Sequence, residues 1–444
     1  MDRMPLKTLH LTNAWHATSG GIKSFYLELL KRANERGHPI RFVVPGEKDC
    51  VEEAGPFGRI YYVESPPAPL NNNYRMMFPK RFLSSDGPIV RILNQEQPDV
   101  VEINDKYTLP YLGGLIRVSK LRGFAYKPTV IGLSCERMDE NMSAYLTQSG
   151  LGQWFSKWYM KAIYFAQFDH HITVSHHAAE ELLQASRGHK VQRGVWVAPM
   201  GVDDMLFHPS RRSAEGRRKL LDLVKGDEGT TLLLYAGRLV PEKNIGLILD
   251  TLERAADCGS FRLLVAGSGN LEAEFKAQAE ARTPGMVQML GHINGREALA
   301  DLYANCDIFV HPNPREPFGI APLEAMASGM ALVAPNSGGV TTYAHSLNAW
   351  LSPPDAETFA SSVRSIVQDP QASAEKRRLA RATAEKYSWN IASDRFLRLY
   401  EEIHARVQGN VIPDSLPPAF LSTLGNFWGT ELKPRTERAT GWFS

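Results

Sequence analysis

Cysteine is scarce in this chain, and its few copies are scattered. The 444 residues include four cysteines, Cys50, Cys135, Cys258 and Cys306, and no two of them form a Cys-x-x-Cys pair. Zinc sites and the disulfide frameworks of small secreted domains need closely spaced or numerous cysteines. The sequence therefore argues against both kinds of site, and a reducing compartment is expected.

Long apolar runs and an excess of one charge are also missing. No stretch is long and apolar enough to span a bilayer, and residues 1–7 do not resemble a signal peptide. Lys and Arg number 50 and Asp and Glu 48, which leaves a formal net charge of +2. Nucleic-acid-binding proteins usually carry a marked basic surface. We expect a cytoplasmic protein that binds no nucleic acid and contacts the inner face of a membrane at most peripherally.

The complete glycine pattern of a dinucleotide site is absent from the first turn. A strand expected at 9–11 is followed by Gly20 and Gly21 and then by a helix-like stretch from 22 to 35. Strand, glycine turn and helix form a Rossmann-like opening, but the Gly-x-Gly-x-x-Gly spacing is incomplete. Gly20 and Gly21 therefore either bind a phosphate-bearing ligand or only form a tight turn.

Short apolar runs alternate with helix-like stretches along most of the chain. The first half has expected strands at 40–44, 60–63, 100–103, 129–133, 171–174 and 195–198. After a boundary near 201–209, the second half has expected strands at 231–236, 261–266, 287–290 and 308–311, with helices at 244–256, 271–281, 296–305, 356–368, 374–386 and 390–407. This alternation predicts parallel sheets covered by helices in two domains, with a ligand in the cleft between them.

The stretch 315–329, Arg-Glu-Pro-Phe-Gly-Ile-Ala-Pro-Leu-Glu-Ala-Met-Ala-Ser-Gly, carries the clearest signal of a site. It follows an expected buried strand and begins a short helix, with Glu316 in the loop and Glu324 in the second helical turn. Backbone N–H groups at a helix start attract an anion such as a phosphate. Carboxylates beside a phosphate would repel it unless they bind hydroxyl groups of a sugar or ribose. The combination indicates a nucleotide-sugar site.

Two cations follow the first strand of the second half. Arg238 and Lys243 lie on a turn that contains a proline, and Asn244 begins the next helix. From this position both cations could contact a diphosphate, although an Arg and a Lys in a loop are more often solvated surface charges. Their place in the same half as Glu316 favours a role in the site.

Together these motifs resemble the retaining glycosyltransferases of family 4, also called group 1. The residues that carry the resemblance are Gly20-Gly21, Gly201-Val202-Asp203 with Phe207, Gly237-Arg238-Leu239 through Lys243-Asn244, Gly267-Ser268-Gly269, Glu316-Pro317-Phe318-Gly319 through Glu324, and Ser337-Gly338-Gly339. The resemblance implies the α/β GT-B fold, in which two Rossmann-like doubly wound domains face each other across a cleft. It implies an N-terminal acceptor domain at 1–203, a nucleotide-sugar domain at 204–389, a crossover helix at 390–408 that packs back on the first domain, and an extension at 409–444.

The resemblance also implies roles for individual residues. Arg238 and Lys243 stabilise the departing diphosphate, Glu316 contacts hydroxyls of the donor sugar, and Glu324 binds the nucleotide ribose. The backbone at Gly20-Gly21 and at Phe318-Gly319-Ile320 assists in donor binding. Fixed cations and N–H dipoles can promote departure of a nucleoside diphosphate without a metal, and no Asp-x-Asp pair stands at a strand end. We therefore expect no cofactor and no metal.

One position departs from the family's pattern. The loop 133–139, Leu-Ser-Cys-Glu-Arg-Met-Asp, places Cys135 where members of the family commonly have a histidine that faces the donor sugar. Backbone groups could take that role, Glu136 and Arg137 could recognise the acceptor, or Cys135 could be a plain buried residue. His16, after the first strand, is a further candidate for the acceptor side.

Two segments leave a membrane role open. The insert 71–82 mixes cations with large apolar residues and is interpreted as a surface loop in preference to an acceptor or membrane contact. The stretch 153–168 has an aromatic stripe at helical spacing, interpreted as core packing in preference to a membrane-facing helix. These two features suggest a lipid-linked or polysaccharide acceptor.

The predicted function is transfer of a hexose from a UDP- or GDP-sugar to a hydroxyl of a glycan or lipid-linked acceptor. Two alternatives remain open at the level of the sequence. One is a nucleotide-sugar epimerase on the same scaffold, and the other is a non-catalytic protein that binds nucleotide sugars or glycans.

Overall fold

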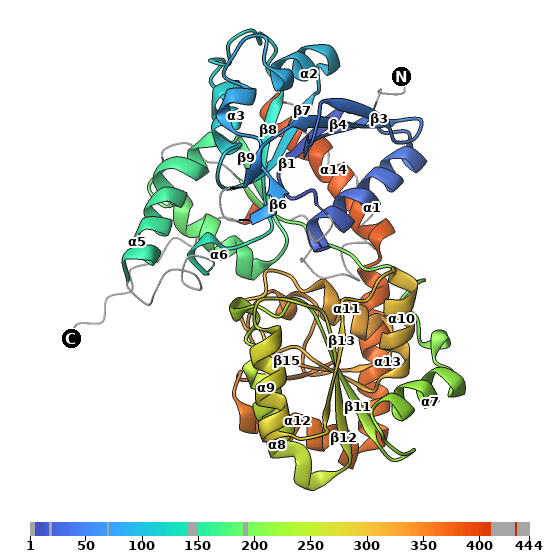
Figure 1. The fold of residues 1–444 in the computed structure, drawn as a ribbon. Helices are drawn as coiled ribbons and strands as arrows, with labels where there is room; N and C mark the ends of the chain where they lie inside the picture. The colour runs from blue at the N-terminus through green and yellow to red at the C-terminus, as the bar shows by residue number, and fades with distance from the viewer. Residues whose placement is uncertain are drawn as a thin grey trace, which may run out of the picture. The chain divides into compact units, whose positions relative to one another are not determined.

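The fold is described from a computed structural model, for residues 5–16, 20–68, 71–140, 150–189, 194–409 and 431–432. The chain forms two compact units (Figure 1). Unit 1 comprises Met1–Ala198 and Ser393–Ser444, and unit 2 comprises Pro199–Ala392. The first division therefore falls at 198/199, near the position 203/204 expected from the sequence. Among the helices of the described residues, none combines the length and apolar character that a membrane span requires.

Unit 1 is built on a nine-stranded sheet with the order β17-β10-β9-β8-β7-β1-β2-β4-β3. Its strands are β1 (Thr8–Thr12), β2 (Ile40–Gly46), β3 (Cys50–Glu53), β4 (Gly58–Glu64), β7 (Val100–Asn104), β8 (Thr129–Ser134), β9 (His170–Thr173), β10 (Val195–Val197) and β17 (Glu431–Leu432). Only the edge pairs β3–β4 and β10–β17 are antiparallel. The carboxyl ends of β1, β2, β4, β7 and β8 therefore lie along one edge of the sheet, where α/β proteins bind ligands.

The helices of unit 1 and its small hairpin complete this layer structure. The helices are α1 (Gly20–Arg36), α2 (Pro88–Glu96), α3 (Pro110–Arg117), α5 (Gly150–Tyr159), α6 (His176–Ser186) and the greater part of α14 (Trp389–Val407), and the hairpin consists of β5 (Pro67–Ala68) and β6 (Asn71–Arg75). All five residues of β1 are buried, because helices cover both faces of a parallel sheet. Phe168 from the end of the aromatic stretch lies in the same apolar core as Leu9 and Leu11.

Helix α14 is attached to unit 1 by polar and aromatic contacts. Asp394 accepts hydrogen bonds from Arg32 and Arg36 of α1, with distances of 2.6 to 3.1 Å. The Tyr400 hydroxyl donates to Glu102 of β7, and the ring of Phe396 packs on Phe25 with 4.6 Å between centroids. Residues almost 400 positions from β1 thus form part of its domain. Beyond 409, only β17 lies within the described residues, so the expected C-terminal extension is otherwise outside them.

The insert 71–82 is not simply a surface loop. Its first residues form β6, residues Pro79–Arg81 form a single 3-10 turn, and the side chains of Met77 and Phe82 are fully buried in the core of unit 1. The Met77 N–H donates to the Asn13 side chain, 2.9 Å away, and so ties the insert to the loop after β1. Met77 and Phe82 therefore belong to the apolar core, whereas Met76 and Phe78 are only partly buried.

The aromatic stretch 153–168 divides into two parts. Trp154, Phe155 and Trp158 of α5 have 65%, 43% and 46% of their surface exposed, so the core-packing interpretation is wrong for them. The helix then loosens into a π-helical turn at Met160–Tyr164, and Tyr164 and Phe165 are fully buried. The one extra residue per turn shifts the face that points to the core. Helical periodicity alone would not reveal this change.

Unit 2 has a six-stranded, fully parallel sheet with the order β13-β12-β11-β14-β15-β16. Its strands are β11 (Thr231–Ala236), β12 (Phe261–Ala266), β13 (Val287–Gly291), β14 (Ile308–Val310), β15 (Ala331–Pro335) and β16 (Trp350–Ser352). Its helices are α7 (Ala214–Leu223), α8 (Gly246–Ala255), α9 (Glu272–Arg282), α10 (Arg296–Asn305), α11 (Ile320–Ala327), α12 (Ala356–Gln368) and α13 (Pro370–Lys386). Figure 1 shows α8 and α9 on one side of this sheet and α10 and α13 on the other.

Helix starts in unit 2 follow the chemistry of their first residues. The Asp355 side chain accepts the Thr358 N–H at 3.0 Å and caps α12, and the Asp369 side chain accepts the Ala372 N–H at 2.9 Å and caps α13. Pro370 stands at the first position of α13, where its fixed φ favours a helix and its missing N–H costs nothing. This helix therefore begins four residues before the expected 374.

Candidate functional site

A close ion pair lies at the carboxyl edge of the unit 2 sheet. The Lys243 ammonium donates to Glu316 Oε2 at 2.6 Å, and the Asn313 side-chain amide donates to the same oxygen at 3.0 Å. Lys243 follows β11 and Glu316 follows β14, and these two strands are neighbours in the sheet. The structure thus brings together two of the three residues predicted to be catalytic, which are 73 positions apart in the sequence.

The turn that presents Lys243 is fixed at both ends. Pro241–Lys243 forms a 3-10 turn with Pro241 at its first position, and Asn244 ends it in the left-handed conformation with φ of 53°. Asparagine tolerates this conformation better than most residues. Its side chain donates to the Pro312 carbonyl at 3.1 Å, so the loop after β11 is tied to the loop after β14. Asn244 therefore ends the turn and ties it to the neighbouring loop. It does not begin the helix as expected, because α8 starts at Gly246.

Two glycines allow the loops of this edge to touch through their backbones. A Cβ atom at Gly267 would overlap the Gly237 carbonyl oxygen, and Gly267 also has a φ of +141°. A Cβ atom at Gly339 would overlap the Pro317 carbonyl oxygen, and the Gly339 N–H donates to the Glu316 carbonyl at 2.6 Å. Glycine is required wherever two backbones approach this closely. These two glycines of the family motifs thus hold the loops of this edge in place.

The charge of Glu316 is set by its neighbours. Burial alone would raise the pKa of this carboxyl, but the Lys243 charge and the hydrogen bonds from Lys243 and Asn313 lower its pKa to about 2. Glu316 is therefore ionised at any physiological pH and is a weak base. A carboxylate in this state is suited to accept hydrogen bonds from hydroxyl groups.

Arg238, the third residue predicted to be catalytic, is placed differently. Its guanidinium donates to Glu242 at 2.7 Å and is more than half exposed. Its carbonyl oxygen accepts a hydrogen bond from the Tyr235 hydroxyl at 2.8 Å, which fixes the backbone after β11. Arg238 stands on the same edge as Lys243 without joining the Lys243–Glu316 pair, and its side chain is paired with a nearby carboxylate on the surface.

The predicted donor-binding backbone lies at the start of α11. Gly319 precedes the helix with φ of +89°, and its carbonyl accepts a hydrogen bond from the Tyr343 hydroxyl. Phe318 is buried and packs edge-on against the Tyr343 ring. Ile320 begins the helix. The N–H groups of Ile320 and Ala321 therefore stand at the helix start, where such groups attract an anion, whereas Pro322 has no N–H. These features are consistent with the role predicted for 318–320, which the structure alone does not test.

Glu324 lies in the second turn of α11, away from the ion pair. Burial raises the pKa of this carboxyl to about 7, and the charge of Arg296 acts in the opposite direction. The buried ring of Tyr303 lies beside it. Glu316 and Glu324 therefore differ in charge near neutral pH, although the sequence presents them as a pair.

The acceptor-side candidates of unit 1 lie on the loop after β8. Cys135 Sγ accepts a hydrogen bond from the Asn104 amide at 3.2 Å, and burial raises the pKa of the thiol, which keeps it protonated. The Glu136 carbonyl accepts a hydrogen bond from the Lys106 ammonium at 2.5 Å. Cys135 is therefore a protonated, neutral thiol that is only partly buried, and its role stays a prediction.

A buried ion pair between Lys106 and Glu181 holds the loop after β8 in place. Lys106 and Glu181 lie 2.6 Å apart with 2% and 5% of their side chains exposed. The other oxygen of Glu181 accepts the N–H groups of Met138 and Asp139 at 2.8 and 2.9 Å. Lys106 follows β7 and Glu181 belongs to α6, so two distant segments position the loop. No local motif in the sequence indicated this pair.

Arg137 and His16 are the remaining acceptor candidates of unit 1, and Gly20 and Gly21 are its predicted donor-binding residues. The Arg137 guanidinium donates to Asp139, to Glu180 and to the His177 carbonyl, so unit 1 already occupies it. The His16 ring packs against the Tyr74 ring of β6. Gly20 and Gly21 begin α1 and are exposed, while residues 17–19 lie outside the described part. Their roles stay predictions.

Two further residues lie at the carboxyl edge of the unit 2 sheet, named the donor edge after its predicted ligand, and the sequence did not predict either of them. Asn313 donates to Glu316 and also accepts the Arg315 N–H at 3.0 Å. His311 is almost fully buried, and burial lowers its pKa to about 4, so it is neutral beside the ion pair. Asn313 could have been found from its position three residues before Glu316, whereas His311 gave no signal beyond the end of a strand. Within the described residues, no three His, Cys, Asp or Glu side chains gather as metal ligands.

Two family models match the chain, one in each half. Glycosyltransferase Family 4 matches residues 19–205, and Glycosyl transferases group 1 matches residues 222–386. The chain belongs to the GT-B glycosyltransferases of the family 4 type. The family that the motifs suggested is thereby confirmed, and the glycosyltransferase carries Lys243, Glu316 and Glu324 within the part that matches group 1.

Relatives of this glycosyltransferase include mycobacterial mannosyltransferases. A Mycobacterium tuberculosis (strain ATCC 25177 / H37Ra) protein named GDP-mannose-dependent alpha-(1-6)-phosphatidylinositol dimannoside mannosyltransferase is 28% identical over 394 residues, which cover 87% of this chain and 94% of the relative. A GDP-mannose-dependent alpha-mannosyltransferase of Mycobacterium tuberculosis (strain CDC 1551 / Oshkosh) is 26% identical over 401 residues, with the same two shares.

Solved structures confirm the GT-B fold class. Sucrose-phosphate synthase from Thermosynechococcus elongatus matches with a TM-score of 0.70 and 20% identity, covering 91% of this chain and all of that one. Anabaena HepE, solved in complex with UDP and glucose, matches with a TM-score of 0.66 and 17% identity over 89% of this chain and all of HepE. At this identity the likeness concerns the fold alone.

Proposed function

We propose that this glycosyltransferase moves a hexose from a UDP- or GDP-sugar to a hydroxyl of a glycan or lipid-linked acceptor, with retention at the anomeric carbon and without a bound metal. The observation that carries the proposal is the set formed by Lys243, Glu316 and Asn313 beside the start of α11. It combines a fixed cation, an ionised carboxylate and a helix start within one edge of a parallel sheet.

Each part of this set has a use in the proposed reaction. The bond between the anomeric carbon and the diphosphate oxygen breaks, and negative charge grows on the diphosphate. Lys243 and the N–H groups at the start of α11 stabilise that charge, and Arg238 adds a second cation if it leaves Glu242. A fixed cation does the work for which other enzymes use a metal ion. Glu316 and Glu324 hold hydroxyls of the sugar and the ribose.

The charge state of Glu316 supports retention. A carboxyl with a pKa of about 2 is a poor base, so it is badly suited to take the proton of the acceptor hydroxyl. The departing diphosphate oxygen is the better base, and it can accept that proton only from the face of the sugar that it leaves. The acceptor then forms its new bond on the same face, and the anomeric configuration is kept.

The comparisons suggest which donor and acceptor to test first. Two relatives are named as GDP-mannose-dependent, and one of them acts on a phosphatidylinositol dimannoside by name. The exposed Trp154 and Trp158 of α5, with the exposed Lys157 between them, support a peripheral contact with an anionic membrane surface. A lipid-linked acceptor would place the enzyme at such a surface.

A donor panel tests the reaction. The full-length protein is incubated with GDP-mannose, UDP-glucose and their counterparts, with and without a phosphatidylinositol-mannoside acceptor and with and without EDTA. We expect one nucleoside diphosphate to be released in proportion to transfer, EDTA to change the rate less than twofold, and NMR to show the donor's anomeric configuration in the product. Isomerised donor without an acceptor would identify an epimerase, and no release from any donor would favour a binding protein.

Vesicle flotation tests the membrane contact separately. We expect the protein to float with vesicles that contain phosphatidylglycerol and to float less after Trp154→Ser and Trp158→Ser. Tyr126→Ser, which removes an exposed aromatic residue far from α5 in the sequence, serves as the control. Equal flotation of the α5 variant and the control would rule out α5 as the contact.

A further inference from the structure

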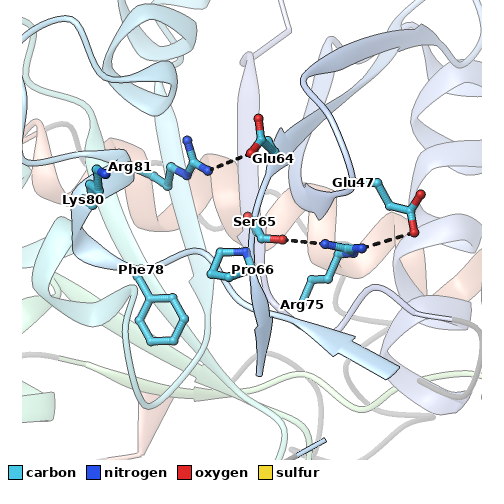
Figure 2. A pocket seen from close by; sticks show the side chains of 8 residues that line it. All are labelled: Glu47, Glu64, Ser65, Pro66, Arg75, Phe78, Lys80 and Arg81. Atoms are coloured by element: carbon cyan, nitrogen blue, oxygen red, sulfur yellow. Dashed lines mark hydrogen bonds and ion pairs between the residues drawn. The ribbon is translucent and has the colours of Figure 1, made fainter. Parts of the chain in front are cut away.

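Unit 1 contains a second polar pocket that neither the donor site nor the loop after β8 uses. Figure 2 shows this pocket between the segments at the ends of β2 and β4 and the insert 71–82. Its volume is about 320 Å³, and it is lined by Glu47, Glu64, Ser65, Pro66, Arg75, Phe78, Lys80 and Arg81. This volume is near the lower end of the range for small-molecule sites and suits a group the size of a phosphorylated monosaccharide.

The pocket stands at the ligand-binding edge of the unit 1 sheet. Gly46 at the end of β2 is in register with Glu64 at the end of β4, and the two strands are parallel. Glu47 and Ser65 are the residues that follow these strands. The acceptor-side candidates His16, after β1, and Cys135, after β8, belong to the same edge because all these strands are parallel.

The walls of the pocket are fixed by the core. Met77 and Phe82, on either side of Phe78 and Lys80, are fully buried. The Arg75 guanidinium donates to the Ser65 carbonyl at 2.8 Å, and the Ser65 N–H donates to the Gly46 carbonyl at 3.0 Å. The arginine is therefore held in a defined position before any ligand binds.

The carboxylates of the pocket are weak partners for its cations. Figure 2 shows Arg75 paired with Glu47 and Arg81 paired with Glu64, at 3.2 and 3.6 Å. Glu47 and Glu64 are 86% and 59% exposed, whereas Arg75 and Arg81 are only 33% and 27% exposed. Ion pairs whose carboxylate is exposed to water contribute little to stability, so a phosphate, which carries more negative charge, can displace the carboxylates.

We propose that this pocket binds a phosphate group of the acceptor, with Arg75, Lys80 and Arg81 around the phosphate and Glu47 and Glu64 free to accept hydrogen bonds from neighbouring hydroxyls. Guanidinium groups bind phosphate oxygens in pairs, and lysine adds a point charge. Cations beside carboxylates are the combination that suits a phosphorylated polyol, as Lys243 and Glu316 are at the donor edge. The proposal rests on the proposed function, because it takes unit 1 as the acceptor domain.

Direct binding to the full-length protein tests the proposal. The soluble probes are myo-inositol 1-phosphate and, as the uncharged match, myo-inositol, and the membrane probes are vesicles of phosphatidylcholine with or without 20% phosphatidylinositol. We expect wild type to bind inositol phosphate or the phosphatidylinositol vesicles, and the triple variant Arg75→Gln, Lys80→Gln, Arg81→Gln to bind at least tenfold more weakly. Loss with both probes indicates a site for phosphate in general, and loss with vesicles alone indicates a lipid headgroup.

Two variants guard against a folding artefact. Lys80→Gln with Arg81→Gln leaves the Arg75 bond to Ser65 intact and should still lose binding about threefold or more, while Arg91→Gln, on the exposed face of α2, should bind like wild type. Equal binding of inositol and inositol phosphate, or wild-type binding by the triple variant, would overturn the proposal. Nucleoside diphosphate binding to the donor site, measured by calorimetry without acceptor, should be unchanged in every variant, so a failure of the proposed function itself would be seen separately.

Discussion

The two units position their site residues in different ways. In unit 2, the Lys243–Glu316 pair is placed by short loops that touch through their backbones at glycines, and each loop directly follows a strand. In unit 1, the loop after β8 is placed by side chains from distant segments, above all the buried Lys106–Glu181 pair. A site made of backbone contacts leaves a recognisable motif, whereas a site supported by buried side chains does not.

The difference fits the two tasks of a glycosyltransferase. A nucleotide diphosphate presents the same groups in every donor, so a fixed backbone geometry serves all of them. Acceptors differ widely in shape and charge, and side chains can be exchanged without changing the sheet that carries them. Variants that perturb each unit separately would break this comparison or make it sharper.

Glu181→Ala should have the largest effect, on unit 1 alone. The change leaves the Lys106 ammonium buried without a counter-charge and leaves the Met138 and Asp139 N–H groups without their acceptor. Breaking one side of a buried pair costs about 3–5 kcal/mol, so the urea midpoint of unit 1 should fall clearly. Glu180→Gln, which changes a mostly exposed carboxylate next to it, should cost less than about 1 kcal/mol.

The donor side is the internal check on this variant. Under conditions where the protein remains folded, nucleotide affinity should stay within about twofold of wild type, because Glu181 and the residues of the donor edge belong to different units. A matching loss of nucleotide binding would show that the two units are not independent in the way the comparison requires.

Lys243→Ala should reduce turnover by about 100-fold to 1,000-fold, because it removes a fixed cation from the departing diphosphate. Lys243→Arg keeps the charge and should recover part of the rate. The measurement is kcat and KM for the donor with wild type and both variants. Near-normal turnover by a variant that lacks both Arg238 and Lys243 would sink the leaving-group role.

Asp394→Asn should weaken the attachment of α14 to unit 1 by about 1–2 kcal/mol at pH 7. Burial would raise the pKa of Asp394, but the Arg32 and Arg36 guanidinium groups lower it to about 2, below its ordinary value of 3.8. The pair therefore stabilises the protein above about pH 4 and loses its effect as the pH falls toward 2. Unfolding at pH 7 and pH 2 should show a difference between wild type and variant that is clearly larger at the higher pH.

Glu401→Gln is the matched control for that experiment. Glu401 lies on the same helix and faces His38 at 3.9 Å, with much of its side chain exposed. Its replacement should change stability by less than about 0.5 kcal/mol at either pH. A pH-independent loss in Asp394→Asn would mean that packing, and not charge, explains the effect.

Most of the strands and the donor edge could be predicted from the sequence. The buried strand β11 is a continuous apolar run, and Glu316, Glu324 and Lys243 stand at fixed distances from strand ends and glycines. Short edge strands such as β3, with all four residues exposed, and β16 gave no such pattern. Apolar periodicity reports burial, and these strands have little of it.

Tertiary contacts decided what the sequence could not. The π-helical turn after Tyr159 separates the exposed Trp154 and Trp158 from the buried Phe165, although all three would share one face of a regular helix. Met77 in the insert is buried because it packs in the apolar core of unit 1, which the neighbouring sequence does not reveal. In the same way, the Glu181 pairing and the pocket beside Arg75 depend on segments that are distant in the sequence.

The pH dependence of donor binding should distinguish Glu324 from Glu316. Burial raises the pKa of Glu324 to about 7, while Glu316 remains ionised because its pKa is about 2. A carboxylate accepts hydrogen bonds from both ribose hydroxyls more readily than a protonated carboxyl does, so a donor should prefer the ionised form. Only about one tenth of a group with this pKa is ionised at pH 6, and nucleotide affinity should therefore fall about tenfold between pH 8 and pH 6.

Glu324→Gln removes the titrating group and keeps its shape. The variant should bind nucleoside diphosphate more weakly than wild type at pH 8, and its affinity should change little between pH 8 and pH 6. Calorimetry at each pH measures both affinities. Arg296 and Asp203 are the other charged groups near Glu324. A variant that keeps the wild-type slope would show that another group titrates, and the two glutamates of the motif would then be alike after all.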